Sequence, residues 1–175
     1  SWFVAVTKRK NDLIQNNKKI NWKPKSTGTG RFGNWLENAN DWNLSRSRYW
    51  GIPLPIWCSV DGKEILVIGS VKELYTEIEK SIQSGFMKKN PFSKFVVDDF
   101  SESNYEKIDL HKHVVDKIIL VSNSNKPLHR EADLLDVWFD SGSMPYAQWH
   151  YPFENKEMID MKSHFPADYI AEGVD

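Results

Sequence analysis

The stretch DVWFDSGSMPYAQWHYPF, residues 136–153, combines side chains that can bind and orient a small molecule. It holds six aromatic rings and two carboxylates, Asp136 and Asp140, the second followed by a Ser-Gly turn signal. A plain core strand would not interrupt its apolar run with acids, and a disordered loop would not carry so many rings. We therefore expect a strand that runs into a pocket, with Trp138 as a flat apolar wall.

A second cluster of small and acidic residues, Glu172, Gly173 and Asp175, follows the apolar stretch ADYIA. The final third of the chain alternates strand, turn, helix and strand patterns, which is typical of a parallel α/β sheet. Neighbouring parallel strands at 134–140 and 167–172 would direct both acidic clusters at one crevice. Carboxylates there can hold an ammonium group or accept hydrogen bonds from ribose hydroxyls, or they can simply cap the strand ends.

The first sixty residues predict two helices and an extended segment. Apolar side chains recur at helical spacing over residues 2–16 and, more strongly, over 31–43. The second helix would place Trp35 and Trp42 on one apolar face, which predicts that both are buried. Two prolines in IPLPIWCSV, residues 52–60, remove ladder donors and indicate an edge strand or an irregular extended segment.

The middle of the chain predicts a strand, a capped helix, a linker and a second strand. Ser70 and Glu73 form a capping box that opens a helix with one apolar face. The expected elements are a turn and short strand at 61–69, a helix from 71 with Val71, Leu74, Ile78 and Ile82 on its apolar face, a linker or mobile loop at 84–107, and a buried strand at 114–121.

The composition gives no overall charge that would attract nucleic acid or a membrane. The formal net charge is -1, so only a local patch could attract an anionic partner. Residues 8–25 form such a patch, with seven Lys or Arg and one acid, although a solvated helix face is the simpler explanation. The single cysteine, Cys58, lies in an apolar run and is expected to be a structural thiol. No membrane-length apolar segment occurs, so we expect a reducing, cytoplasmic setting.

Three segments together resemble the isoleucyl-tRNA synthetases, a branch of the class I aminoacyl-tRNA synthetases. They are DVWFDSGSMPYAQWHYPFEN, FPADYIAEGVD and RFGNWLENANDWNLSRSRYWGIPLPIW. Valyl and leucyl enzymes share this outline, and the corresponding piece of a valyl enzyme is an alternative. The residues DVWFDSGSMPYA of the first segment favour the eukaryote-like branch of the isoleucyl enzymes. The chain begins without Met and ends inside an apolar pattern, so we expect an internal fragment between the editing domain and the KMSKS region.

The resemblance implies an α/β fold: part of a split Rossmann-type nucleotide-binding domain with a small mixed α/β connective insertion. Residues 1–57 would return from the editing insertion, 58–130 would form the connective insertion, and 131–175 would open the second Rossmann half. The full-length enzyme would use ATP and Mg²⁺ to activate isoleucine and charge tRNA(Ile). Neither the HIGH nor the KMSKS signature occurs here, so we expect an inactive fragment with no catalytic residue and no bound cofactor.

The resemblance also assigns roles to individual residues. Glu172, Gly173 and Asp175 match the adenylate-binding motif, and Trp138 matches the tryptophan that lines the aliphatic side-chain pocket. Two arginines in SRSRYWG are expected either to contact tRNA or another phosphate or to form structural ion pairs: Arg46 and Arg48.

Two other interpretations rest on composition. Eight tryptophans and the basic patch could belong to a module that binds single-stranded nucleic acid or sugar by stacking, which would require exposed rings. His111 and His113 would share one face of a strand, as two metal ligands do, but a third ligand at suitable spacing is missing. We therefore predict no metal site.

Overall fold

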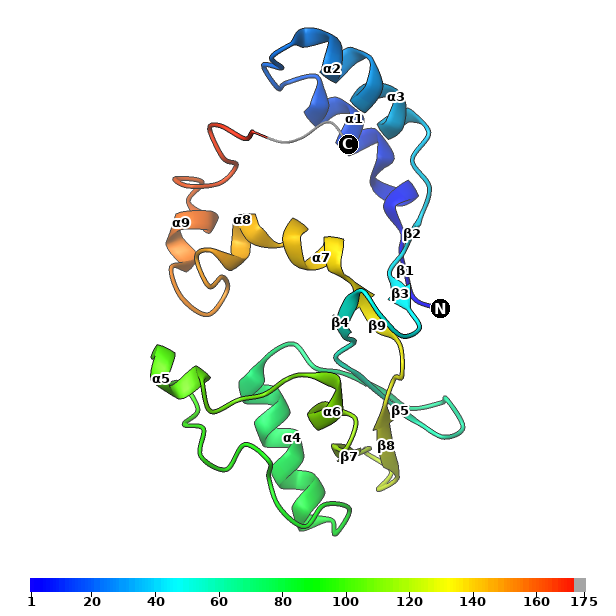
Figure 1. The fold of residues 1–175 in the computed structure, drawn as a ribbon, viewed down its shortest axis with the longest axis vertical. Helices are drawn as coiled ribbons and strands as arrows, with labels where there is room; N and C mark the ends of the chain where they lie inside the picture. The colour runs from blue at the N-terminus through cyan, green and yellow to red at the C-terminus, as the bar shows by residue number, and fades with distance from the viewer. Residues whose placement is uncertain (172–175) are drawn as a thin grey trace.

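The computed structural model describes residues 1–171. Figure 1 shows three parts that follow one another along the long axis: a group of N-terminal helices, a small sheet continued by the helices of the last third, and a second sheet with helix α4. Every strand pair among these residues is antiparallel. The parallel sheet expected from the sequence is therefore wrong for this part of the chain, while a mixed α/β architecture is confirmed.

The N-terminal helices are shorter than the sequence predicts. They are a 3-10 helix at Val6–Arg9, α1 at Lys10–Asn17, α2 at Lys25–Thr29 and α3 at Arg31–Glu37; the flanking strands β1 (Phe3–Val4) and β2 (Trp42–Asn43) pair with each other.

The helix expected over residues 31–43 ends at Glu37, because the next residue favours termination. The Asn38 side chain donates to the Asn34 carbonyl at 2.8 Å, beside the Asn38 amide at 3.1 Å, and such local side-chain bonding competes with continuation of the helix. Trp42 consequently lies in β2, and Trp35 is 61% exposed. The predicted burial of Trp35 is wrong, and Trp42 is half-buried.

The central sheet joins segments that are about ninety residues apart in sequence. Its order is β3-β9-β4, with strands at Ser45–Arg46 (β3), Leu134–Asp136 (β9) and Gly51–Pro53 (β4). The edge position of Pro53 agrees with the prediction for the proline-containing segment. Residues 167–171 form no strand, so the predicted parallel pairing with 134–140 does not occur within the described residues.

The four-stranded sheet has the order β6-β5-β8-β7, and helix α4 packs against it in Figure 1. Its elements are β5 (Ile56–Ser59), β6 (Ile65–Val67), β7 (Ile119–Val121), β8 (Pro127–Arg130) and α4 (Val71–Gln83). The core between them contains Ile78 from α4 and Leu120 and Leu128 from the strands, each 1% exposed or less. Trp57 Nε1 donates to the Ile118 carbonyl at 2.9 Å, so the buried indole is also satisfied.

Helix α4 begins as predicted. Ser70 Oγ accepts from the Glu73 amide at 3.0 Å, and Glu73 Oε2 accepts from the Gly69 amide at 2.7 Å. The reciprocal bond thus reaches one residue further back than in the usual capping box. Leu74 and Ile78 are buried, which confirms the apolar face of this helix.

Residues 84–107, expected to be a linker or mobile loop, instead pack onto the same core. Phe92 and Phe95 are buried there, and helix α5, Glu102–Tyr105, follows them. Asn104 is fully buried and donates to the carbonyls of Val96 and Asp99 at 2.8 and 2.7 Å. These two phenylalanines and this asparagine hold the segment in a defined conformation, although its polar composition predicted a mobile loop.

The segment 114–121, expected to be one strand, begins as the end of a helix. Residues Lys112–Val115 form α6, and only Ile119–Val121 form β7. His111 precedes α6 and His113 lies within it, so they do not share a strand face. Both rings lie against the carboxylate of Asp109 instead.

The last third contains three short helices, and the first of them occupies residues that the sequence predicts to be a strand. They are α7 (Val137–Gly142), α8 (Met144–Ala147) and α9 (Lys156–Asp160). The segment LLDVWFD is therefore a strand only up to Asp136 and a helix afterwards. Figure 1 shows α7 leaving directly from the end of β9.

Candidate functional site

The end of β9 is organised around one buried acid, Asp136, which is 3% exposed. Its Oδ2 accepts from Arg46 Nη2 at 2.5 Å and from Trp42 Nε1 at 3.2 Å. Its Oδ1 accepts from the Trp138 amide at 3.0 Å and so caps the N-terminus of α7. One carboxylate thereby joins strands β2, β3 and β9 to the helix that carries Trp138.

Arg46 makes further contacts in this arrangement. Besides Asp136, its guanidinium donates to the carbonyls of Asn43 and Ser45 at 3.0 and 2.9 Å. The structural ion pair considered for Arg46 is thus present. Arg48 is exposed, and its guanidinium lies over the ring of Tyr49 at 4.9 Å.

A close backbone contact fixes β4 against β9 beside this acid. Gly51 pairs with Asp136, and a Cβ added at Gly51 would lie 2.1 Å from the Leu135 carbonyl oxygen. Immediately before it, Trp50 has a positive φ of 63° and is 84% exposed. A large exposed ring thus directly precedes the tight strand contact.

Trp138 lies on the first turn of α7 and is 70% exposed. Asp140 and Gly142, expected at a strand end, lie on the same helix. Glu172, Gly173 and Asp175 lie outside the described residues. Among residues 1–171, Asp136 connects the Trp138 amide to Arg46 through its two carboxylate oxygens.

Sequence reasoning missed the role of Asp136 as the centre of this site. The available signal was its type and position, because Asp is a preferred N-cap residue when it precedes a helix. That signal was masked by the β-branched and aromatic residues that follow it, which favour a strand. The partnership with Trp42 could not be found from sequence, since the two residues are 94 positions apart.

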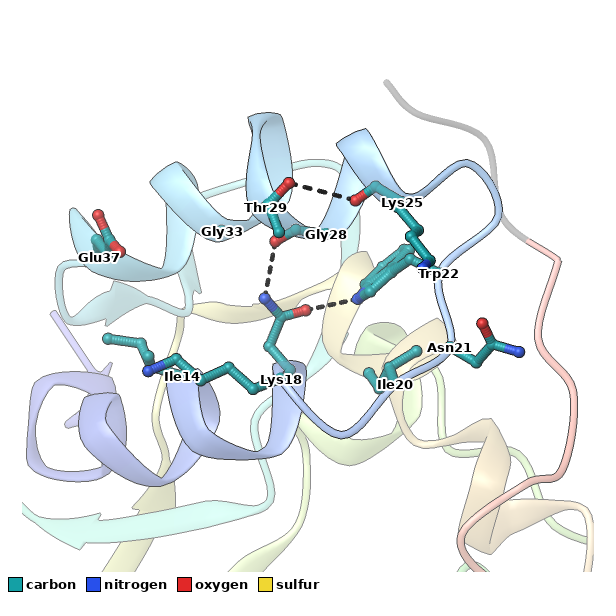
Figure 2. Close-up of a pocket in the computed structure, with 11 residues that line it drawn as sticks. Ile14, Lys18, Ile20, Asn21, Trp22, Lys25, Gly28, Thr29, Gly33 and Glu37 are labelled. Atoms are coloured by element: carbon teal, nitrogen blue, oxygen red, sulfur yellow. Dashed lines mark hydrogen bonds between the residues drawn. The ribbon is translucent and has the colours of Figure 1, made fainter.

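A hollow of about 340 Å³ lies between α1 and α2, shown in Figure 2. The Asn17 side chain bridges its wall: Nδ2 donates to the Gly28 carbonyl at 2.9 Å, and Oδ1 accepts from Trp22 Nε1 at 2.8 Å. Lys18 and Lys25 contribute to its lining. The hollow is therefore a fixed, partly aromatic surface with cationic side chains.

Other chemically capable groups in the described residues have structural explanations. Burial raises the pKa of the Cys58 thiol, and the negative charge of Glu131 raises it further, which makes it a poor nucleophile. No three His, Cys, Asp or Glu side chains within residues 1–171 are arranged to hold a metal ion. No helix of that part is both long and apolar enough to cross a membrane.

Comparison with known proteins identifies close relatives. The whole chain, residues 1–175, matches the family described as tRNA synthetases class I (I, L, M and V). It is 63% identical over 177 residues to an isoleucine–tRNA ligase of Bacteroides thetaiotaomicron and 62% identical over 175 residues to one of Porphyromonas gingivalis. An isoleucine–tRNA ligase of Treponema denticola is 47% identical over 176 residues.

These alignments cover all of the chain but only 15%, 15% and 14% of the three relatives. The chain thus spans about a seventh of the length of the relatives it matches. All three are bacterial, so the expected eukaryote-like branch is not supported.

Proposed function

Since this chain belongs to the class I tRNA synthetases of the I, L, M and V group, we propose that it is a segment of an isoleucine–tRNA ligase. The observation that carries the proposal is identity of 58–63% over the full chain to five isoleucine–tRNA ligases. The exposure of Trp35 and Trp50 is what a stacking module would require, but family membership over the whole chain favours the ligase.

The longer protein would activate isoleucine with ATP and transfer it to tRNA(Ile) in protein synthesis. Residues 1–57 and 131–175 would belong to a split Rossmann-type catalytic domain, and 58–130 to a connective insertion. The pairing of β3 and β4 with β9 is in keeping with this division, because it joins the two outer segments. A cytoplasmic location suits a protein of this function with one unpaired cysteine.

In this proposal Trp138 forms the apolar wall against the isoleucine side chain. Asp136 and Arg46 have a positioning role, because their ion pair fixes the start of α7 and thus the direction of the indole. Glu172, Gly173 and Asp175 would bind the aminoacyl-adenylate. The exposed face of Trp138 would be covered by parts of the longer protein, which complete the pocket.

Two observations guide where Mg²⁺ and the phosphates of ATP are proposed to bind. No group of three potential metal ligands occurs within residues 1–171, and the sequence contains neither phosphate-binding signature of the family. We therefore assign the phosphates of ATP and the metal to other parts of the longer protein.

The test is amino-acid-dependent ATP–pyrophosphate exchange by the longer protein that contains this chain. Isoleucine should support exchange most efficiently. Valine, one methylene smaller, should support it less well, a discrimination for which these enzymes are the standard example. Replacing Trp138 by Ala should raise the KM for isoleucine. Exchange that depends on leucine or methionine and not on isoleucine would contradict the proposal.

A further inference from the structure

The N-terminal helices carry a concentration of cationic side chains. All but one are exposed, Lys10 being half-buried, and they come from α1, α2, α3 and the connections around them: Lys8, Arg9, Lys10, Lys18, Lys19, Lys23, Lys25 and Arg31. The only acid within residues 8–31 is Asp12. The surface is thus strongly positive, although the whole chain has a net charge of -1.

Internal ion pairing does not account for these charges. Within the described residues, the only salt bridge of this group joins Arg9 and Asp12 at 3.4 Å, and both side chains are highly exposed. Of the nearby acids, Asp41 accepts from the amide and hydroxyl of Thr7, and Glu37 lines the hollow without an ion pair. Most of the cations are therefore available to an external anion.

The support beneath the cations is rigid. Asn17 connects α1 to α2 through the Gly28 carbonyl, and the Trp22 ring packs against Phe32 with centroids 5.1 Å apart. A Cβ at Gly28 would lie 2.1 Å from Trp22, so the ring and α2 are in close contact. Figure 2 shows Lys18 extending along α1 and Lys25 beside Trp22, on different sides of the hollow.

We propose that this surface, around the hollow between α1 and α2, contacts the phosphate backbone of tRNA. Separated lysines on a fixed support suit a row of phosphates better than a single small anion, since backbone contacts require cations at intervals and no base-specific groups. Displacement of counterions by such contacts supplies affinity that depends on salt. The inference rests on the proposed function and adds the surface by which the segment would meet its nucleic-acid substrate.

The test compares two sets of three charge-removing substitutions in the longer protein. K18Q/K23Q/K25Q removes cations around the hollow. K88Q/K89Q/K94Q removes three exposed cations from the segment that follows α4, and Figure 1 shows this segment at the end of the fold opposite α1 and α2. The first variant should bind tRNA about tenfold more weakly at low salt. The slope of log K against log salt should fall by about one for each lysine–phosphate pair that the substitutions remove. The second variant should retain wild-type affinity and slope.

Isoleucine-dependent ATP–pyrophosphate exchange needs no tRNA and should be unchanged in both variants. If the wild type lacks exchange, the proposed function fails, while the tRNA measurements still decide the inference. Equal loss of affinity in both variants would show a diffuse charge effect, and an unchanged slope in the first would also overturn the proposal. If the triple variant loses exchange through misfolding, K25Q alone should lower the slope by about one, and K18R/K23R/K25R should preserve it.

Discussion

A buried carboxylate needs compensation, and at Asp136 this requirement decides the local structure. Its side chain is 4% exposed, so an unpaired charge there would be costly. Arg46, Trp42 and the Trp138 amide supply three donors to its two oxygens. The residue therefore links the direction of α7, and with it Trp138, to the ends of two strands from the N-terminal part.

Replacing Asp136 by Asn should lower the free energy of unfolding by about 2 kcal/mol. The amide keeps the shape and can still cap α7, but it loses the charge-assisted bond and leaves the Arg46 charge unpaired. Partial exposure of Arg46, 37% for its side chain, keeps the loss below that of a fully buried pair. Urea unfolding of the 175-residue chain measures the change.

The matched control is D98N, because Asp98 pairs with Lys72 at 2.7 Å where both side chains are well exposed. Its effect should stay within about 0.5 kcal/mol. Equal effects of the two substitutions would show that the Asp136 ion pair contributes no more to stability than an exposed ion pair does.

The Asp116 carboxyl predicts a pH effect. Burial raises its pKa, but bonds and charges from Arg130 and Lys112 outweigh burial and leave the pKa below its usual value. A folded-state pKa below the unfolded value of about 3.9 gives stability that is present above that value and is lost as pH falls through the folded pKa.

The advantage of wild type over D116N should therefore be complete near pH 6 and shrink as pH falls below about 4. Urea midpoints of both proteins between pH 3 and 7 check this. A constant difference across that range would show that Asp116 acts through shape and not through its charge. Comparison with the variant is needed because other carboxyls, including Asp61 and Glu64, also have lowered pKa values.

Among the elements, close backbone approach limits which residues the central sheet accepts. Replacing Gly51 by Ala would place its Cβ 2.1 Å from a backbone oxygen of β9, which cannot move without breaking the strand pairing. We expect a loss of at least about 2 kcal/mol. Thermal unfolding of the chain provides the measurement.

Gly142 is the control for Gly51, because an added Cβ there meets no atom within 4 Å. It is the last residue of α7, where alanine is the better helix former, so G142A should be neutral or stabilising by up to about 1 kcal/mol. Destabilisation by G142A as large as that by G51A would contradict the steric explanation.

Elements whose signals are local were predictable, and α4 is the clearest case. Ser70 and Glu73 begin it, and Leu74 and Ile78 define its buried face within one stretch of sequence. By contrast, Val137, Trp138 and Phe139 favour a strand by type but form a helix. Asp136 caps that helix while pairing with Arg46 from a distant strand, and propensity contains no information about such a partner.

The same distinction applies to the candidate site. The residues around Trp138 in the sequence were enough to identify it as a candidate site residue. They did not predict that it would lie exposed on a helix. The two ends of the chain meet through β3, β4 and β9, and this antiparallel pairing depends on contacts across about ninety residues. The expected parallel sheet failed because strand direction is set by such contacts and not by the order of the elements.

At the scale of the whole molecule, the chain contains the proposed apolar wall and a basic surface but no cations assigned to the reacting phosphates. Neither HIGH nor KMSKS occurs in its 175 residues. Activation of an amino acid builds negative charge around the α-phosphate, and loss of preorganised cations there removes most of the stabilisation of the transition state. Trp138 is 70% exposed as well, so isoleucine at the proposed wall would not be shielded from water.

The purified 175-residue chain should therefore show no isoleucine-dependent ATP–pyrophosphate exchange, whereas the longer protein should be active. The assay uses both proteins at equal concentration. A mixture of the two is measured as well, and activity of the longer protein in that mixture excludes an inhibitor in the preparation of the 175-residue chain. Exchange that scales with the concentration of the chain and survives repurification would contradict this expectation. It would mean that the groups stabilising the α-phosphate lie within these residues, and the assignment of the ATP phosphates to other parts of the protein would have to be abandoned.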